Sequence, residues 1–295
     1  MKKNVIVGIG EILWDIFPEG KKLGGAPCNF AYHSAAQGAE GITVSAVGED
    51  QDGNEIIAGI KDRKLTTDYI SRAPYPTGTV TVKVNDGIPS YIIHQDTAWD
   101  NLKWTENLHT LAAQTDAVCF GSLAQRNSVT ANTIYKFLDS VRESCVKIFD
   151  VNLRQNFYNE KLLRKSLGYA NILKISDEEL PAFAVALDFG TPSEEDLFKH
   201  LFEEFALDML VYTRGEKGCR CICPKTKTDD LIPANSPGKL ADTVGCGDSF
   251  TAAFTVGILR GLSPHDAASH AVKVAGFVST CSGGTPEIPV ELILK

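Results

Sequence analysis

The sequence predicts an α/β protein in which helices cover both faces of a mostly parallel central sheet. Short, nearly continuous apolar runs alternate along the chain with longer windows of helical periodicity. Apolar runs of this kind are typical of strands buried on both faces, as in parallel sheets. With 295 residues, 43% of them apolar, the chain can form a large core without disulfides or a structural metal.

The elements follow one another in a regular order. The apolar runs predict strands at 5–9, 42–47, 117–121, 146–150, 171–175 and 209–213. The helical windows lie at 27–37, 53–64, 129–144, 177–187, 193–205, 247–260 and 264–280. Because no repeat or clear linker interrupts this order, we expect a single domain over residues 1–295.

One section departs from the alternation. Residues 79–84 have the period of two expected of a half-buried strand, and 91–94 read as a second strand after the turn signal Asn85-Asp86-Gly87. The stretch 16–23 also lacks helical periodicity. Two interpretations follow: a small, discontinuous β lid formed by about 16–23 and 75–95, or a surface hairpin without function.

Charge and hydropathy exclude several classes of protein. The chain has 29 basic and 37 acidic residues, a net charge of −8, so nucleic-acid binding is not expected. A small anion remains an acceptable ligand because local dipoles can hold one. The chain has no apolar run of about 18 residues, and the run at 5–9 is too short for a signal peptide. We therefore expect no membrane association and a cytoplasmic location.

The cysteines do not suggest a disulfide framework. The chain has eight, none in a C-x-x-C pair, and free thiols fit a reducing compartment. Cys219, Cys221 and Cys223 alternate, which predicts one face of a strand. Three small buried hydrophobic residues are a better interpretation of this run than a metal site.

Two common nucleotide-binding motifs are excluded. The P-loop pattern G-x-x-x-x-G-K-[ST] does not occur. Gly8-Ile9-Gly10 follows a predicted strand, but Leu13 stands where the dinucleotide motif needs a third glycine. No helix is predicted directly after it, so a dinucleotide fold is not expected.

The most informative segment is D-T-V-G-C-G-D at residues 242–248, which opens a predicted helix. In such a turn the backbone N–H groups of Gly245, Cys246 and Gly247 can point at one spot, aided by the helix dipole. This favours an anion pocket suited to a phosphoryl group. Asp248 beside it has two interpretations, a base for an incoming hydroxyl or a residue that stabilises the start of the helix.

A second segment, L-G-G-A-P-C-N at residues 23–29, lies near the N-terminus. Gly24 and Gly25 allow close backbone approach to a ligand, and Asn29 offers both a donor and an acceptor. Asp15, after the first strand, can accept hydrogen bonds from sugar hydroxyls. A tight turn before a helix that begins at Pro27 explains the same residues without a ligand.

Together, and in this order, the two segments resemble those of the ribokinase-like (PfkB) carbohydrate kinases. Supporting matches are A-V-G-E-D at 46–50, P-T-G-T at 76–79, A-W-D at 98–100, D-V-N-L-R at 150–154 and T-R-G-E-K-G at 213–218. The resemblance covers the whole chain and is strongest to the fructokinase branch. It implies a three-layer α/β/α sandwich with a β lid, and transfer of a phosphoryl group from ATP to the 6-hydroxyl of D-fructose, with Mg²⁺. 2-Keto-3-deoxygluconate and ribose are alternative substrates, and a non-catalytic sugar-binding regulator is an alternative of another class.

The resemblance also implies residue roles. Asp248 would be the catalytic base, with Gly245, Cys246 and Gly247 forming the anion hole. The helix dipole favours the charged form of Asp248, so we expect a weak base whose positioning matters as much as its basicity. The residues expected to bind the sugar are Asp15, Gly24, Gly25, Asn29, Arg154 and Asp248.

The nucleotide side is implied in the same way. The residues expected there are Ser176, Thr213, Gly215, Gly218, Gly245 and Gly247. Glu179 would organise Mg²⁺ through water, but the run S-D-E-E at 176–179 is equally typical of a helix start. Asp242 with the Val244 carbonyl would hold a monovalent cation such as K⁺; a plain loop carboxylate is the alternative for Asp242. Two residues depart from the family pattern, since Cys246 replaces the usual alanine and Ser176 the usual asparagine. The β lids of similar proteins often mediate dimers, so a homodimer is also expected.

Overall fold

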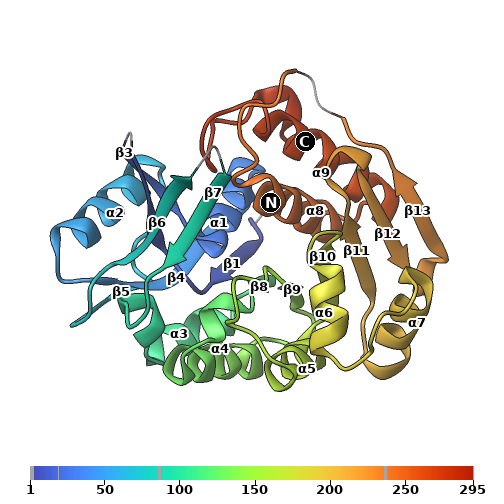
Figure 1. The fold of residues 1–295 in the computed structure, drawn as a ribbon, viewed down its shortest axis with the longest axis horizontal. Coiled ribbons are helices and arrows are strands. Elements are labelled where there is room, and N and C mark those ends of the chain that lie inside the picture. The colour runs from blue at the N-terminus through green and yellow to red at the C-terminus, as the bar shows by residue number, and fades with distance from the viewer. Residues whose placement is uncertain (1–2, 19, 86–87, 236–237, 295) are drawn as a thin grey trace.

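A large central sheet organises the protein (Figure 1). The computed structural model describes residues 1–295 except 1–2, 19, 86–87, 236–237 and 295, and leaves out the side chains of 82–91. Within that described part the sheet has nine strands in the order β13-β12-β11-β10-β9-β8-β1-β4-β5. Their bounds in chain order are β1 Val5–Ile9, β4 Glu40–Gly48, β5 Ile70–Ala73, β8 Ala117–Phe120, β9 Val146–Asp150, β10 Ile172–Ser176, β11 Met209–Thr213, β12 Cys219–Cys223 and β13 Thr228–Ile232. Neighbouring strands are parallel from β5 to β11, and the β11–β12 and β12–β13 pairs are antiparallel.

Helices cover both faces of this sheet, which makes three layers (Figure 1). One apolar core joins the sheet to α3 Glu106–Ala112, α4 Ser128–Ser140, α5 Glu160–Tyr169, α6 Leu180–Ala186 and α7 Glu194–Glu204. A second core joins the opposite face to α1 Ala26–Ala36, α8 Cys246–Leu259 and α9 Pro264–Val278. Strand β1 illustrates why both faces need covering, since Val5 and Val7 point into the first core and Ile6 points into the second. Helix α2, Gln51–Asp62, packs in a smaller cluster through Ile56 and Ile60.

A second, smaller sheet lies beside the main one, in the order β3-β2-β6-β7 (Figure 1). It is built from two separate segments, the hairpin of β2 Leu13–Phe17 and β3 Gly20–Gly24, and the hairpin of β6 Gly78–Asn85 and β7 Ile88–Ile93. Strands β2 and β6 pair in parallel and join the hairpins. These are close to the segments predicted for the lid, although the predicted turn residues Asp86 and Gly87 lie outside the described residues.

The predicted α/β class is confirmed, and each strand predicted from an apolar run has a counterpart in the large sheet. Four elements were not predicted from the sequence: α3, α5, β5 and β13. Cys219, Cys221 and Cys223 are buried on one face of β12 as predicted, and no cluster suited to a metal ion occurs among the described residues. None of the described helices is both long and apolar enough to cross a bilayer.

Candidate active site

A cavity of about 720 Å³ opens at the carboxyl ends of the parallel strands, the usual place for ligands in open α/β sheets. The small sheet forms one wall through Asp15, Val80 and Ile93, and the first turn of α8 forms another. The residues that follow β1, β9 and β10 complete the lining. Segments far apart in the sequence therefore meet at one place.

The cavity brings most of the predicted site residues together. Those that line it are Asp15, Gly25, Asn29, Arg154, Ser176, Glu179, Gly245, Gly247 and Asp248. The predicted residues outside its lining are Gly24, Thr213, Gly215, Gly218, Asp242 and Cys246. Asp15, Asn29, Arg154 and Asp248, predicted from four separate segments, border one space.

Asp248 lies in the first turn of α8, where its Oδ2 accepts a hydrogen bond from Asn29 Nδ2 at 2.8 Å. Burial raises the pKa of this carboxyl to about 6, and Asp150 adds to the increase. Asn29, Lys174 and Arg154 oppose it. The prediction that the helix dipole makes Asp248 a weak base is therefore wrong, because desolvation outweighs the charge-stabilising groups. A carboxylate with this pKa is ionised near neutral pH and well matched to accept a proton.

The glycine turn before α8 is shaped by close contacts. Gly245 has φ 77°, and a Cβ there would lie 2.4 Å from the Gly284 carbonyl oxygen, so only glycine fits without strain. The N–H of Cys246 donates to the Thr243 carbonyl at 3.2 Å. Of the three N–H groups predicted for the anion hole, this one is already engaged within the turn. Gly245 and Gly247 both border the cavity.

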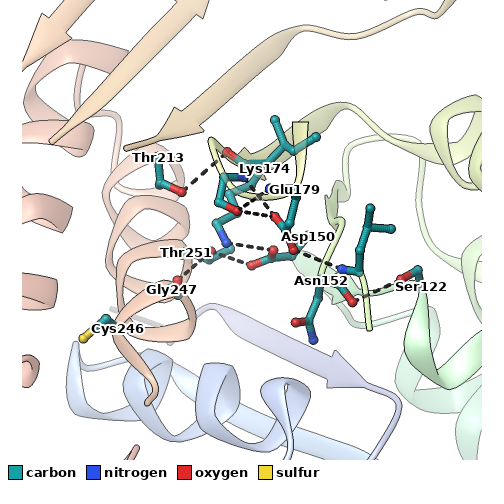
Figure 2. A network of polar contacts seen from close by, with 12 residues as sticks. Ser122, Asp150, Asn152, Lys174, Glu179, Thr213, Cys246, Gly247 and Thr251 are labelled. Atoms are coloured by element: carbon teal, nitrogen blue, oxygen red, sulfur yellow. Dashed lines mark hydrogen bonds and ion pairs between the residues drawn. The ribbon is translucent and has the colours of Figure 1, made fainter. Parts of the chain in front are cut away.

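The Cys246 side chain turns away from the cavity (Figure 2). Its Sγ packs against the core of α8 and α9 and lies 3.8 Å from the Asp242 carbonyl oxygen. Burial raises the pKa of the thiol to about 12, so the group is protonated and a poor nucleophile. The thiol therefore forms no part of the cavity wall.

The paired glycines serve the site indirectly. A Cβ at Gly24 would lie 2.3 Å from Asp15 Oδ2, so this glycine makes room for the carboxylate. Gly25 has φ 110°, and a Cβ there would lie 2.5 Å from the Glu11 carbonyl oxygen. Burial raises the pKa of Asp15 to about 6, while the charge of Arg154 lowers it. Asp15 and Arg154 thus form the polar end of the cavity beside the small sheet.

Glu179 joins two loops at the strand ends. Its Oε1 accepts from the Leu153 N–H at 3.0 Å, and its Oε2 accepts from the Ser176 N–H and hydroxyl, both at 2.9 Å. The charge of Lys174 and the hydrogen bonds from Ser176 lower the pKa of Glu179 despite burial. An ionised carboxylate with most of its lone pairs engaged fits a role as a partner for water around Mg²⁺ better than a direct ligand. The same contacts also fix the start of the α6 segment.

The remaining predicted nucleotide residues lie further along the sheet edge. Thr213 pairs in register with Ser176 on the neighbouring strand, which places it beside the cavity lining. A Cβ at Gly218 would lie 1.9 Å from the Ile232 carbonyl oxygen, so this glycine permits the close approach of the end of β13. Gly215 has φ 50° and opens a short 3-10 turn.

Asp242 lies in the loop before α8. It accepts hydrogen bonds from the N–H groups of Val244 at 3.0 Å and Gly283 at 3.1 Å. Lys22 Nζ lies 3.9 Å from Asp242 Oδ2. A cation already stands next to this carboxylate.

Lys174, Asp150 and Glu11 also line the cavity and were not among the predicted site residues. Figure 2 shows Lys174 and Thr251 pointing toward Asp150, which accepts from Lys174 Nζ at 3.0 Å and from Thr251 Oγ1 at 2.9 Å. Glu11 is 2% exposed, and burial raises its pKa to about 7. Each carries charge within or beside an apolar strand, a signal that the sequence did contain.

The chain is similar to known proteins over most of its length. The model of the pfkB family of carbohydrate kinases matches residues 2–291. The sugar kinase PH1459 of Pyrococcus horikoshii is 29% identical over 275 residues, covering 87% of this chain and 83% of that protein. A fructokinase of Salmonella typhimurium is 26% identical over 275 residues, covering 88% of this chain and 85% of its own.

Solved structures share the fold. The crystal structure of PH1459 in complex with ATP has a TM-score of 0.79 at 26% identity and covers 95% of this chain and 94% of its own. The crystal structure of a Xylella fastidiosa fructokinase with bound ATP has a TM-score of 0.84 at 20% identity. It covers 98% of this chain and 96% of its own.

Fold and sequence together define a carbohydrate kinase, an enzyme that transfers a phosphoryl group from ATP to a sugar hydroxyl. The chain belongs to the pfkB family. The predicted resemblance and the predicted ribokinase-like fold are confirmed.

Proposed function

We propose that this enzyme phosphorylates D-fructose at its 6-hydroxyl, with Asp248 as the base. Several relatives named fructokinase support this choice of substrate, including that of Salmonella typhimurium. The observation that carries the proposed role of Asp248 is its place in the cavity, where it is held by Asn29 and has a pKa of about 6.

The polar end of the cavity suits a neutral sugar. Asp15 and Glu11 both line this cavity, and a neutral sugar can donate hydroxyl hydrogens to such carboxylates without charge repulsion. Arg154 supports a second candidate, a sugar acid such as 2-keto-3-deoxygluconate, because its guanidinium can bind a carboxylate. A 5-dehydro-2-deoxygluconokinase of Bacillus anthracis, 26% identical, is also among the relatives. Ribose remains the third substrate to test.

In the proposed reaction Asn29 orients the Asp248 carboxylate, which accepts the hydroxyl proton of the sugar. The N–H groups of Gly245 and Gly247 would face the phosphoryl oxygens, on which charge is spread during transfer. Ser176, Thr213, Gly215 and Gly218 are proposed to border the nucleotide phosphates. Glu179 would hold water that surrounds Mg²⁺, and the bound ion would offset phosphate charge.

The small sheet is proposed to act as a lid. Its side chains Val80 and Ile93, both largely buried, line the cavity with Leu13. Closure over a bound sugar would exclude water and limit hydrolysis of ATP. We also propose that this sheet pairs two subunits in a homodimer, which sedimentation velocity would test.

Two further properties complete the proposal. The first is a K⁺ site formed by Asp242 and the Val244 carbonyl. If it exists, the enzyme should be more active in KCl than in tetramethylammonium chloride. Because Lys22 lies beside Asp242, the Lys22→Met variant offers a control in which any dependence on K⁺ should increase. We also propose a cytoplasmic location, which follows from the substrates.

A sugar panel tests the proposed function. Production of ADP is measured in a coupled assay with D-fructose, 2-keto-3-deoxygluconate and D-ribose, and we expect the highest kcat/KM for fructose. A higher value for either other sugar would replace the proposed substrate. Binding of sugar without turnover at saturating MgATP would instead indicate a regulator.

A further inference from the structure

We propose that Lys174 is a catalytic residue whose ammonium group contacts the transferred phosphoryl group, and that Asp150 is its positioning residue. The inference rests on ATP as the phosphoryl donor and does not depend on which sugar is the acceptor.

Lys174 lies in an unusual place for a lysine. It belongs to strand β10 between Leu173 and Ile175, which are fully buried, and is itself 8% exposed. Burying an ammonium group costs free energy unless an anion compensates. Its partner Asp150 occupies the equivalent register position on β9. Stability alone is a weak explanation for a buried ion pair of this kind. Apolar residues of similar volume in its place would often stabilise a protein as well or better.

The ammonium group borders the first turn of α8. A Cβ added at Gly247 would lie 3.2 Å from Lys174 Nζ, so glycine leaves the space that the ammonium group approaches. Both residues line the cavity. A cation next to a helix N-terminus is opposed by the helix dipole, whose positive end lies there. The Lys174 ammonium group and the N-terminus of α8 are both positive and border the same space. An anion bound between them would compensate both.

Asp150 holds Lys174 next to the first turn of α8. Its Oδ1 accepts from Lys174 Nζ, and its Oδ2 accepts from Thr251 Oγ1, one turn after Gly247 in α8 (Figure 2). Thr251 Oγ1 also lies 2.9 Å from the Gly247 carbonyl oxygen. The carboxylate thus ties β9, β10 and the start of α8 together at the anion-hole end of the cavity.

The pair also suits the charge that develops during transfer. The sugar hydroxyl oxygen forms a bond to the γ-phosphorus while the bond to the β,γ-bridging oxygen breaks, the hydroxyl proton passes to Asp248, and ADP leaves. Glu11, Glu179 and Asp248 also line the cavity and would repel the triphosphate. Lys174 supplies a preorganised positive charge there. Burial alone would lower its pKa, but the charges of Asp150 and Glu179 outweigh that effect and hold the pKa above its usual value. It therefore stays protonated throughout the reaction.

Isothermal titration calorimetry without sugar tests the contact. AMP-PNP, which carries a γ-phosphoryl group, and ADP, which does not, are each bound to wild type, Lys174→Met and Lys174→Gln. We expect the affinity for AMP-PNP to fall about tenfold or more and the affinity for ADP by less than about twofold. The control Ile175→Val perturbs the same strand on its other face and should change neither. Equal losses for both nucleotides, or no loss, would overturn the proposal.

A second measurement needs no variant. In a crystal structure of the wild-type enzyme with MgADP and beryllium fluoride, we expect Lys174 Nζ within about 3.2 Å of a fluoride that stands in for a phosphoryl oxygen. A separation beyond about 5 Å, with Lys174 held only by Asp150, would refute the contact even if both variants failed to fold. Because neither test contains a sugar, failure here is distinct from failure of the proposed substrate.

Discussion

Replacing Asp248 with asparagine should stabilise the protein while it removes activity. The change keeps the size of the side chain and leaves an oxygen to accept from Asn29 Nδ2, but it removes a charge that burial disfavours. The pKa of Asp248 rises from 3.8 to about 6 on folding. The folded state therefore binds the proton more tightly, and wild-type stability decreases as pH rises through that interval.

The magnitude follows from this shift. About two pKa units correspond to about 3 kcal/mol as an upper bound. The carboxylate borders an open cavity, so water reduces the cost, and we expect a gain of about 1–2 kcal/mol for Asp248→Asn above pH 6. For a chain of this size the gain raises Tm by about 2–4 °C.

Differential scanning calorimetry from pH 4 to pH 8 is the assay. The Tm difference between variant and wild type should be small near pH 4, where Asp248 is protonated in the folded state and only about half ionised in the unfolded state, and reach its full value above pH 6. The control is Asp50→Asn, because hydrogen bonds from the Gly53 N–H and from Thr77 lower the pKa of Asp50. That control should instead lower Tm near neutral pH. A destabilised Asp248→Asn protein at pH 8 would refute the assignment of a costly buried charge.

Three further predictions concern activity. Because Asp248 must be ionised to accept a proton, kcat/KM should decrease tenfold per pH unit below about pH 6; a flat profile down to pH 4.5 would contradict this. Gly24→Ala places a methyl group against Asp15, so in steady-state kinetics the KM for the sugar should increase about tenfold or more while the KM for ATP changes little. Equal increases in the two KM values would argue against this effect. Cys246→Ala should retain kcat within about twofold, and the native thiol should resist iodoacetamide at pH 7.5, because the side chain lies outside the cavity lining and its pKa is about 12. Rapid inactivation on alkylation of Cys246 would contradict that placement.

Local patterns in the sequence were enough to predict most strands of the main sheet and most of the helices. The apolar runs at 5–9 and 146–150 coincide with β1 and β9, because fully buried parallel strands need continuous apolar residues. Helices α3 and α5 were missed. Helix α3 is only 7 residues long, and α5 is largely polar apart from a few buried positions such as Leu163 and Leu167.

The site was predictable only in part. The glycine segments marked its two ends, and Asp248 stands where the motif suggested. The pair of Asn29 with Asp248 joins α1 to α8, and no local pattern shows that these two helices pack together. The basicity of Asp248 was predicted with the wrong sign, since the sequence shows its place at a helix start but not its desolvation. Lys174 was overlooked because its partner Asp150 lies on a different strand.

The most direct test of fructose phosphorylation with Asp248 as the base is ³¹P NMR of the reaction with MgATP and D-fructose, for wild type and Asp248→Asn. For wild type we predict a fructose 6-phosphate signal that appears as the ADP signals grow. For Asp248→Asn, at equal concentration and with its fold verified, the rate should be about 10²–10⁴-fold lower. Undiminished fructose 6-phosphate formation by the variant would contradict the role of Asp248 as the base. ADP formed by wild type without any sugar phosphate would contradict phosphorylation of fructose.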